Sequence, residues 1–138
     1  MSDHADLPIN QILAALPPAE YRRLASHLKP VDLISGEILL EVNEPIKKIY
    51  FPQRAMISLV SIMMDGSTTE IGLIGNEGMI GLTAILGGYS TTSRTIVQIS
   101  GSALEVSAEV VLQEFQRGEK LQKLLLLYTQ ALLTQVSQ

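Results

Sequence analysis

The stretch that decides the fold is IKKIYFPQRAMISLVSIMMDGSTTEIGLIGNEG, residues 46–78. Apolar residues recur at every second position in three of its segments, at Ile49/Phe51, Ile57/Leu59 and Ile71/Leu73. This alternation is typical of strands that bury one face, and the runs DGS and GNEG are turn signals. No helical period lies between the segments. The stretch therefore predicts consecutive antiparallel strands and excludes parallel strands joined by helices.

The same alternation continues on both sides of this stretch. It is found before it at Val31/Leu33 and Ile38/Leu40/Val42, and after it in RTIVQIS and SALEVS around Gly101. This gives about seven or eight short strands with turns roughly every eight to twelve residues, the spacing of an antiparallel barrel or jelly roll. We therefore predict a mainly β fold with flanking helices.

Helical signals precede the first strand. Residues 9–30 predict two short helices, the first ended by Pro17-Pro18 and the second started by the same prolines, which are tolerated in a first helical turn. The apolar face of the second helix consists of Tyr21, Leu24, Ala25 and Leu28. Pro30 is expected to end this helix.

Two more helices are predicted after the last strand. Ser107 is placed to cap SAEVVLQEFQ, which is broken near Gly118. A longer helix, EKLQKLLLLYTQALLTQVSQ, runs from about Glu119, and its end carries no Gly, Asn or Pro stop signal. We expect this helix to continue further, so that the chain is the front part of a longer protein.

The long helix has two apolar stripes. One contains Leu121, Leu125, Tyr128 and Leu132, and the other contains Leu124, Leu127, Ala131 and Thr134. A helix that covers one barrel needs only one apolar face, so two faces predict two partners: its own barrel and the same helix of a second subunit. We assign the homodimer interface to Leu121, Leu125, Tyr128 and Leu132. Residues 1–118 then form the barrel domain, and residues 119–138 begin the dimerisation helix.

Composition limits the other possibilities. The chain has no cysteine, which excludes disulfides and thiolate metal sites. Its longest apolar run, LLLLY, is far shorter than the ~20 residues that cross a bilayer, and its start, MSDHADLP, has no signal-peptide pattern. The net charge is −4 and the basic residues are scattered. We expect a cytoplasmic protein with no membrane partner, whose present residues do not bind DNA.

The order of these elements resembles the sensor domain of Crp/Fnr-type bacterial transcription regulators, within the cyclic-nucleotide-binding superfamily. The resemblance covers residues 10–138 and depends on NQILAALPPAEYRRLASHLKPVDLISGEIL, IKKIYFPQRAMISLV and DGSTTEIGLIGNEGMIGL. It implies a jelly-roll barrel, a long helix that forms a parallel dimer, and a DNA-binding domain that would follow. It also implies an effector, either a cyclic nucleotide or another small molecule.

The family's phosphate-binding cassette corresponds to MIGLTAILGGYSTTSRTIVQ, residues 79–98. The candidate pocket residues are Gly81, Leu82, Thr83, Ser93, Arg94 and Thr95. Leu82 occupies the position of the acid that would bind a ribose hydroxyl. Arg94 is displaced by one residue from the arginine position, and a one-residue slip turns a strand side chain to the opposite face. We expect the cassette to keep its shape and to lose its sugar chemistry.

Three uses of this pocket stay open at this point: no bound nucleotide, which we favour, ordinary cyclic AMP binding, or a different ligand. An alternative function is a genuine cyclic AMP- or cyclic GMP-binding module that regulates an enzyme or channel. No catalytic function is predicted. His4 and His27 lie outside the predicted strands, so a cupin-type metal site is excluded, and no GxSxG motif is present.

Overall fold

The computed structural model describes residues 8–136, so His4 and residues 137–138 lie outside the described part. Seven strands in this part form two antiparallel sheets, in the orders β1-β7-β3 and β2-β6-β4-β5. The strands are β1 (Lys29–Leu33), β2 (Ile38–Leu40), β3 (Lys48–Pro52), β4 (Met56–Ile62), β5 (Thr68–Ile74), β6 (Arg94–Ile99) and β7 (Gly101–Ser107). The predicted antiparallel jelly-roll fold with flanking helices is confirmed.

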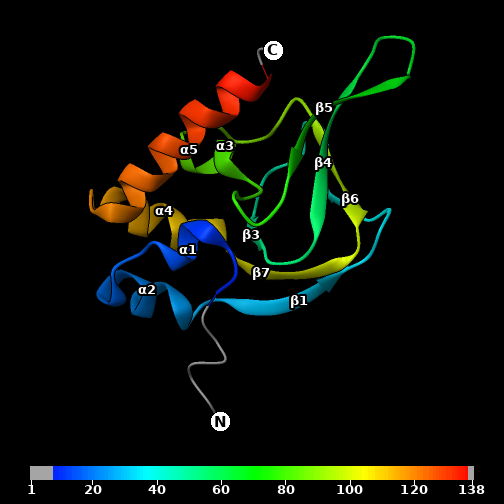
Figure 1. Cartoon of the computed structure of the whole chain (residues 1–138). Helices are drawn as coiled ribbons and strands as arrows, with labels where there is room; N and C mark the ends of the chain where they lie inside the picture. Colours follow the sequence, from blue (N-terminus) through cyan, green and yellow to red (C-terminus); the bar gives the residue numbers. More distant parts are fainter. Residues whose placement is uncertain (1–7, 137–138) are drawn as a thin grey trace.

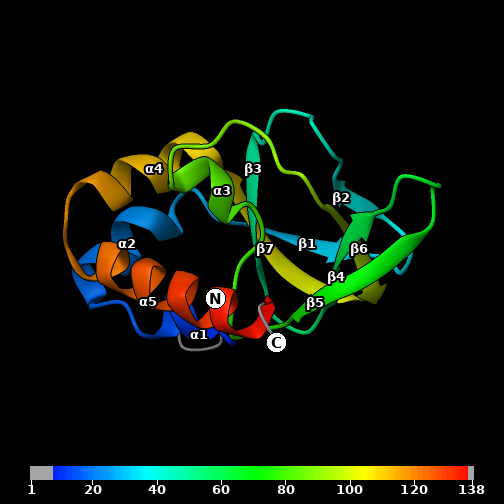
Figure 2. The ribbon, with the colours of Figure 1, turned by 90° about the horizontal axis from the view of Figure 1, so that it is seen from above.

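The helices gather at one end of the two sheets (Figures 1 and 2). They are α1 (Gln11–Ala14), α2 (Pro18–Ala25), α3 (Leu82–Ile85), α4 (Ala108–Gln116) and α5 (Lys120–Val136). The long helix α5 contacts α1, α4 and β5, so it lies along the side of the sheets and does not project from them. Within residues 8–136, no helix is both long enough and apolar enough to cross a membrane.

Local sequence signals explain where most of the helices begin. The hydroxyl of Ser107 accepts a hydrogen bond from Glu109 N at 3.2 Å, so Ser107 caps α4 as predicted. Pro18 lies at the start of α2, and Gly118 has φ +71° between α4 and α5. A positive φ suits glycine because it has no Cβ.

The predicted end of α2 is wrong. The helix stops at Ala25, and β1 already begins at Lys29, which pairs with Glu105 of β7. Pro30 therefore lies inside an edge strand, where its missing N–H is tolerated because one side of the strand has no neighbour. Pairing with β7 overrides the helical pattern of the local sequence.

The first half of α5 belongs to the protein's own core. Leu121 and Leu125 are 1% and 0% exposed, and they pack in the cluster that contains Leu24, Phe51 and Val111. Our assignment of Leu121 and Leu125 to a dimer interface is therefore wrong, because their side chains are already covered. Tyr128 and Leu132 pack against the same cluster and are partly buried.

The other side of α5 is exposed and apolar. Leu126, Leu127 and Leu133 are 50%, 57% and 63% exposed. The helical period explains the division, since residues 121, 125, 128 and 132 share the face that meets the core. We refer below to Leu126, Leu127 and Leu133 as the outer face of α5; Leu133 lies at the edge of this face, since it also lines the cavity described below.

Candidate functional site

The segment after β5 folds back under β3 and turns sharply into α3. Tyr50 and Ile80 exchange two backbone hydrogen bonds, of 3.1 and 2.8 Å. Gly81 follows with φ +103°, and a Cβ at this position would lie 2.6 Å from Ile49 Cδ1 and 3.2 Å from Lys48 O. Both the positive φ and the close approach require glycine. Gly81 thus sets the position of α3.

A cavity of about 230 Å³ lies between this segment, the second sheet and α5. It is lined by Leu40, Leu59, Ile74, Met79, Ile80, Gly81, Leu82, Thr83, Leu86, Thr91, Ser93, Thr95, Thr129, Leu132 and Leu133. None of these described lining residues carries a charge. The last three belong to α5, so this helix forms one wall of the cavity.

The structure brings five of the six predicted pocket residues together. Gly81, Leu82, Thr83, Ser93 and Thr95 all line the cavity. Their shared position follows from the α3 turn, which places residues 81–83 near the start of β6. The clustering of these five residues agrees with the prediction from the cassette sequence.

Arg94 is the exception, and its assignment to the pocket is wrong. Ser93 and Thr95 are 9% and 2% exposed and face inward, so the alternation of the strand turns Arg94 away from the cavity. Its Nε donates to Glu41 Oε1 at 2.8 Å. This hydrogen bond lowers the pKa of the Glu41 carboxyl below its ordinary value, with help from the Val42 N–H. The outward position of Arg94 is the one expected from its one-residue displacement in the sequence.

The polar groups of the cavity are hydroxyls. Thr95 Oγ1 accepts from Leu40 N at 2.9 Å, which leaves its own proton for another acceptor. Thr91 and Ser93 place their hydroxyl oxygens 3.3 Å apart. Thr129 donates to Leu125 O at 2.7 Å within α5. The site can therefore offer a few neutral hydrogen bonds but no ion pair.

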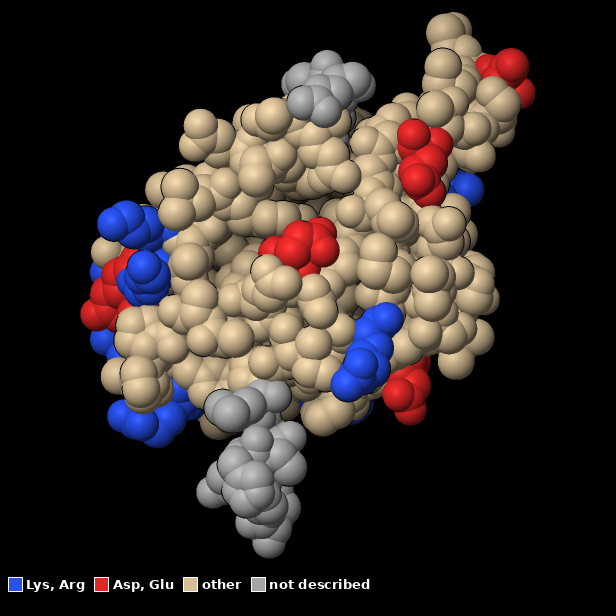
Figure 3. Space-filling view, viewed as in Figure 1, with Lys and Arg blue, Asp and Glu red and all other residues tan. Residues whose placement is uncertain are grey.

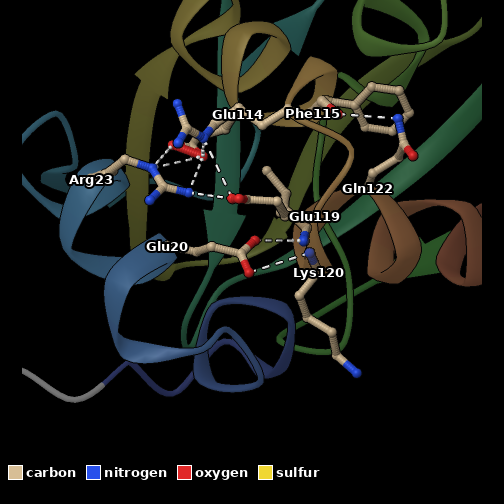
Figure 4. Close-up of polar contacts among 9 residues, drawn as sticks. Glu20, Arg23, Glu114, Phe115, Glu119, Lys120 and Gln122 are labelled. Carbon is tan, nitrogen blue, oxygen red and sulfur yellow. Dashed lines mark hydrogen bonds and ion pairs between the residues drawn. The ribbon is translucent and has the colours of Figure 1, made fainter.

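The start of α5 is held by α2 (Figure 4). The carboxylate of Glu20 accepts from Lys120 N at 3.2 Å and from Leu121 N at 2.9 Å, and Glu20 is only 7% exposed. It satisfies two of the N–H groups that a helix start leaves without partners, and its charge suits the positive helix end. Sequence reasoning missed this cap because the two segments lie about 100 residues apart.

One turn further along α2, Arg23 joins α4 to the start of α5. Its Nε lies 2.7 Å from Glu114 Oε1, and its Nη2 lies 2.6 Å from Glu119 Oε1 (Figure 4). Glu114 is 8% exposed, so this carboxylate requires a cationic partner. Glu20 and Arg23 together fix the angle at which α5 leaves Gly118 and runs to the cavity.

The middle of α5 is packed against the turn that leads into the pocket. The Tyr128 hydroxyl lies against Gly78, where a Cβ would collide with it. The Met79 amide approaches this oxygen but does not meet hydrogen-bond geometry, so the buried hydroxyl has no partner among the described residues. Burial, with a smaller contribution from the charge of Glu77, raises the pKa of Tyr128 to about 12.

Charged side chains are distributed unevenly over the surface. In the view of Figure 3, Lys and Arg gather where α2 and α4 meet the start of α5, while the surface over the rest of α5 is largely uncharged. Within α5, the basic residues Lys120 and Lys123 both lie in the first turn. The part of α5 that closes the cavity therefore combines an apolar inner wall with an apolar outer face.

A protein-family model described as "Cyclic nucleotide-binding domain" matches residues 30–118, more than half of the chain. The chain belongs to the cyclic nucleotide-binding domain family. A search of curated proteins found no significant match.

Solved structures of cyclic nucleotide-binding-like domains share the fold. The sensor domain of the transcriptional regulator DNR from Pseudomonas aeruginosa is 15% identical, with a TM-score of 0.72 over 97% of this chain and 89% of that chain. The c-di-GMP responsive global regulator CLP from Xanthomonas campestris is 12% identical, with a TM-score of 0.75 over 88% and 61%. A regulatory subunit of a cAMP-independent protein kinase A from Trypanosoma brucei is 15% identical, with a TM-score of 0.67 over 78% and 39%.

The residues of the cavity do not fit a cyclic nucleotide. A bound phosphate requires a cation or charge-assisted hydrogen bonds, and Arg94 is paired with Glu41 outside the cavity. The side chain of Leu82, 9% exposed, lines the cavity and cannot accept a hydrogen bond. A ribose hydroxyl buried there without a partner would cost ~1–3 kcal/mol. The described lining of the cavity therefore offers hydroxyl groups and apolar side chains but no ionic group.

Proposed function

We propose that this chain is the effector-sensing and dimerisation domain of a Crp/Fnr-like DNA-binding transcription regulator. The observation that carries the proposal is the double role of α5, which forms one wall of an internal cavity and presents an exposed apolar face outward. The similarity to the DNR sensor domain and to the regulator CLP supports it. The cytoplasm is the expected location of such a regulator.

The outer face of α5 would pair with the same face of a second copy. Leu126 and Leu133 are seven residues apart, which is one heptad, and Leu127 lies beside this line. Exposed leucines in water favour association because burial removes apolar surface from water. In a parallel two-fold pair, each leucine would meet its own counterpart.

The mechanism would be a shift between two arrangements of the α5 pair. An effector in the cavity would contact Thr129, Leu132 and Leu133. Its affinity would therefore differ between the two arrangements of α5, and binding would favour the arrangement with the higher affinity. Glu20 and Arg23 set the position of the helix start. Because the chain carries a net charge of −4 without a basic stripe, contact with DNA would need a segment other than residues 1–138.

A second candidate is a regulatory module that controls a kinase or a channel. The similarity to the Trypanosoma brucei protein kinase A regulatory subunit, at a TM-score of 0.67, supports this candidate. Such a module does not require self-association through α5. The oligomeric state therefore discriminates between the two functions.

Sedimentation velocity of the 138-residue chain tests the proposal. We expect a reversible dimer of about twice 15.0 kDa at roughly 100 µM protein. Leu126→Ser combined with Leu127→Ser, two exposed residues that do not line the cavity, should return it to monomer. Ile34→Ser, which changes a residue of similar exposure (60%) away from α5, should leave the dimer intact. A monomer at this concentration would refute the proposal.

A further inference from the structure

We infer that the cavity accepts an uncharged, mainly apolar small molecule and rejects molecules that carry a phosphate or another anionic group. This inference rests on the proposed role of the cavity as the effector site, and it names the chemical class of the effector. The cavity measures about 230 Å³, so a molecule of two fused rings with one further ring attached would fill it.

The absence of charge in the described lining is the first reason. A buried anion is stable only with a cation or several strong donors around it. Arg94, the one basic residue within residues 79–98, already shares a 2.8 Å contact with Glu41 on the outer side of β6. Helix α3 has only four residues, so its peptide dipoles add little.

The nature of the walls is the second reason. Leu40, Leu59, Ile74, Ile80 and Leu82 meet in the cavity from four different segments of the chain. Apolar walls with a few well-placed polar groups are the usual environment of a neutral ligand. The Thr95 hydroxyl provides such a group, because it accepts from Leu40 N–H and still has its own proton to donate.

The position of α5 makes this selectivity relevant to regulation. Leu132 and Leu133 face the same cavity as Leu82 and Thr95, so a bound molecule touches both the sheet and the helix. Apolar contacts strengthen as more surface is covered. An uncharged effector would therefore hold the last turns of α5 against the second sheet.

A pair of fluorescent probes with the same rings tests the inference. N-phenyl-1-naphthylamine is uncharged, whereas 8-anilinonaphthalene-1-sulfonate adds one sulfonate to the same skeleton. We expect saturable one-to-one binding of the uncharged probe and at least about tenfold weaker binding of the sulfonate, since the cavity offers the sulfonate no counter-charge.

Substitutions at the edge of the cavity show whether the probes bind there. Thr83 lines the cavity and is exposed, so Thr83→Trp should block the uncharged probe without unfolding the chain. Thr92→Trp is the matched control, because Thr92 is exposed and lies outside the lining. Thr83→Lys supplies the missing cation and should strengthen sulfonate binding about tenfold, whereas Thr92→Lys should not.

Two results would overturn the inference. One is binding of the sulfonate as tight as that of the uncharged probe in the wild-type protein, blocked by Thr83→Trp. The other is the absence of any uncharged-probe binding that Thr83→Trp removes. Sedimentation of the same samples tests the proposed function independently of the ligand class. If the protein is a dimer and binds the sulfonate more tightly than the uncharged probe, the proposed regulator role stands and only the inferred ligand class is refuted.

Discussion

Leu125 and Leu127 lie two positions apart on α5, and we predict opposite consequences when each is shortened to alanine. Leu125 is 0% exposed and lies in the core, so Leu125→Ala leaves a cavity and should cost ~2–5 kcal/mol of folding free energy. Leu127 is 57% exposed, so Leu127→Ala should change the stability of the monomer by less than ~0.5 kcal/mol.

For dimerisation, we expect Leu127→Ala to have the larger effect and Leu125→Ala the smaller one. If the exposed half of Leu127 is buried between two copies, its loss removes ~1 kcal/mol per subunit and ~2 kcal/mol per dimer. The dissociation constant should then rise roughly 30-fold. Leu125→Ala leaves the outer face intact, so any folded Leu125→Ala protein should dimerise as the wild type does.

Urea unfolding at several protein concentrations measures both effects. The midpoint of a folding dimer rises with concentration, and Leu127→Ala should abolish most of that rise. Leu125→Ala should lower the midpoint at every concentration without changing the slope m. The assignment of the two faces would be refuted if Leu127→Ala lowered the midpoint as much as Leu125→Ala in the dilute, monomeric range.

Three further substitutions test other parts of the structure. Glu20→Ala should cost ~1–2 kcal/mol by leaving the Leu121 N–H buried without a partner, whereas Glu20→Gln should recover part of this loss in the same urea titration. Gly81→Ala should cost ~2 kcal/mol or more because of its φ of +103°, and unchanged stability would contradict the tight turn. Tyr128 has a folded pKa of about 12 against 10.0 when unfolded, so its stabilisation is complete below about pH 10 and is lost as the pH rises toward 12. Tyr128→Phe should reduce this alkaline loss, with Tyr50 retaining its share, and an unchanged pH profile would refute the burial of the hydroxyl.

Local patterns in the sequence predicted most of the fold. Alternation at Ile57/Leu59 and Ile71/Leu73 predicts the positions of β4 and β5 correctly, but the predicted buried face of β5 is wrong, because the structure buries Gly72 and Ile74 and leaves Ile71 and Leu73 half-buried. Ser107 acts through a hydroxyl that bonds to the backbone two residues later, and Gly118 acts through its own positive φ, so their roles at the ends of α4 are visible in the sequence. These features depend on neighbours within a few residues, which is the range that periodicity and capping rules cover.

Features that depend on distant residues could not be predicted. The Glu20 cap and the early start of β1 at Lys29 both require a partner about 75 to 100 residues away along the chain. The two stripes of α5 are both apolar, so composition alone could not decide which one the core would cover. The structure decides it, since Leu121 and Leu125 are buried with Leu24.

The candidate site depends partly on local sequence signals and partly on contacts between distant residues. The turn at Gly81 and the slip at Arg94 were both visible in the sequence, because a glycine turn and strand alternation are local properties. The Glu41 partner of Arg94 was not, since it lies 53 residues earlier. The contribution of α5 residues such as Thr129 to the cavity wall also depends on tertiary packing.

Calorimetric titration with cyclic AMP, on the wild-type protein and on Arg94→Ala, tests most directly whether the cassette has lost its ionic chemistry. We predict no saturable binding up to roughly 1 mM for either protein, because Arg94 is held by Glu41 outside an uncharged cavity. Micromolar binding by the wild type that disappears in Arg94→Ala would contradict this, since it would require Arg94 to leave Glu41 and bind the phosphate.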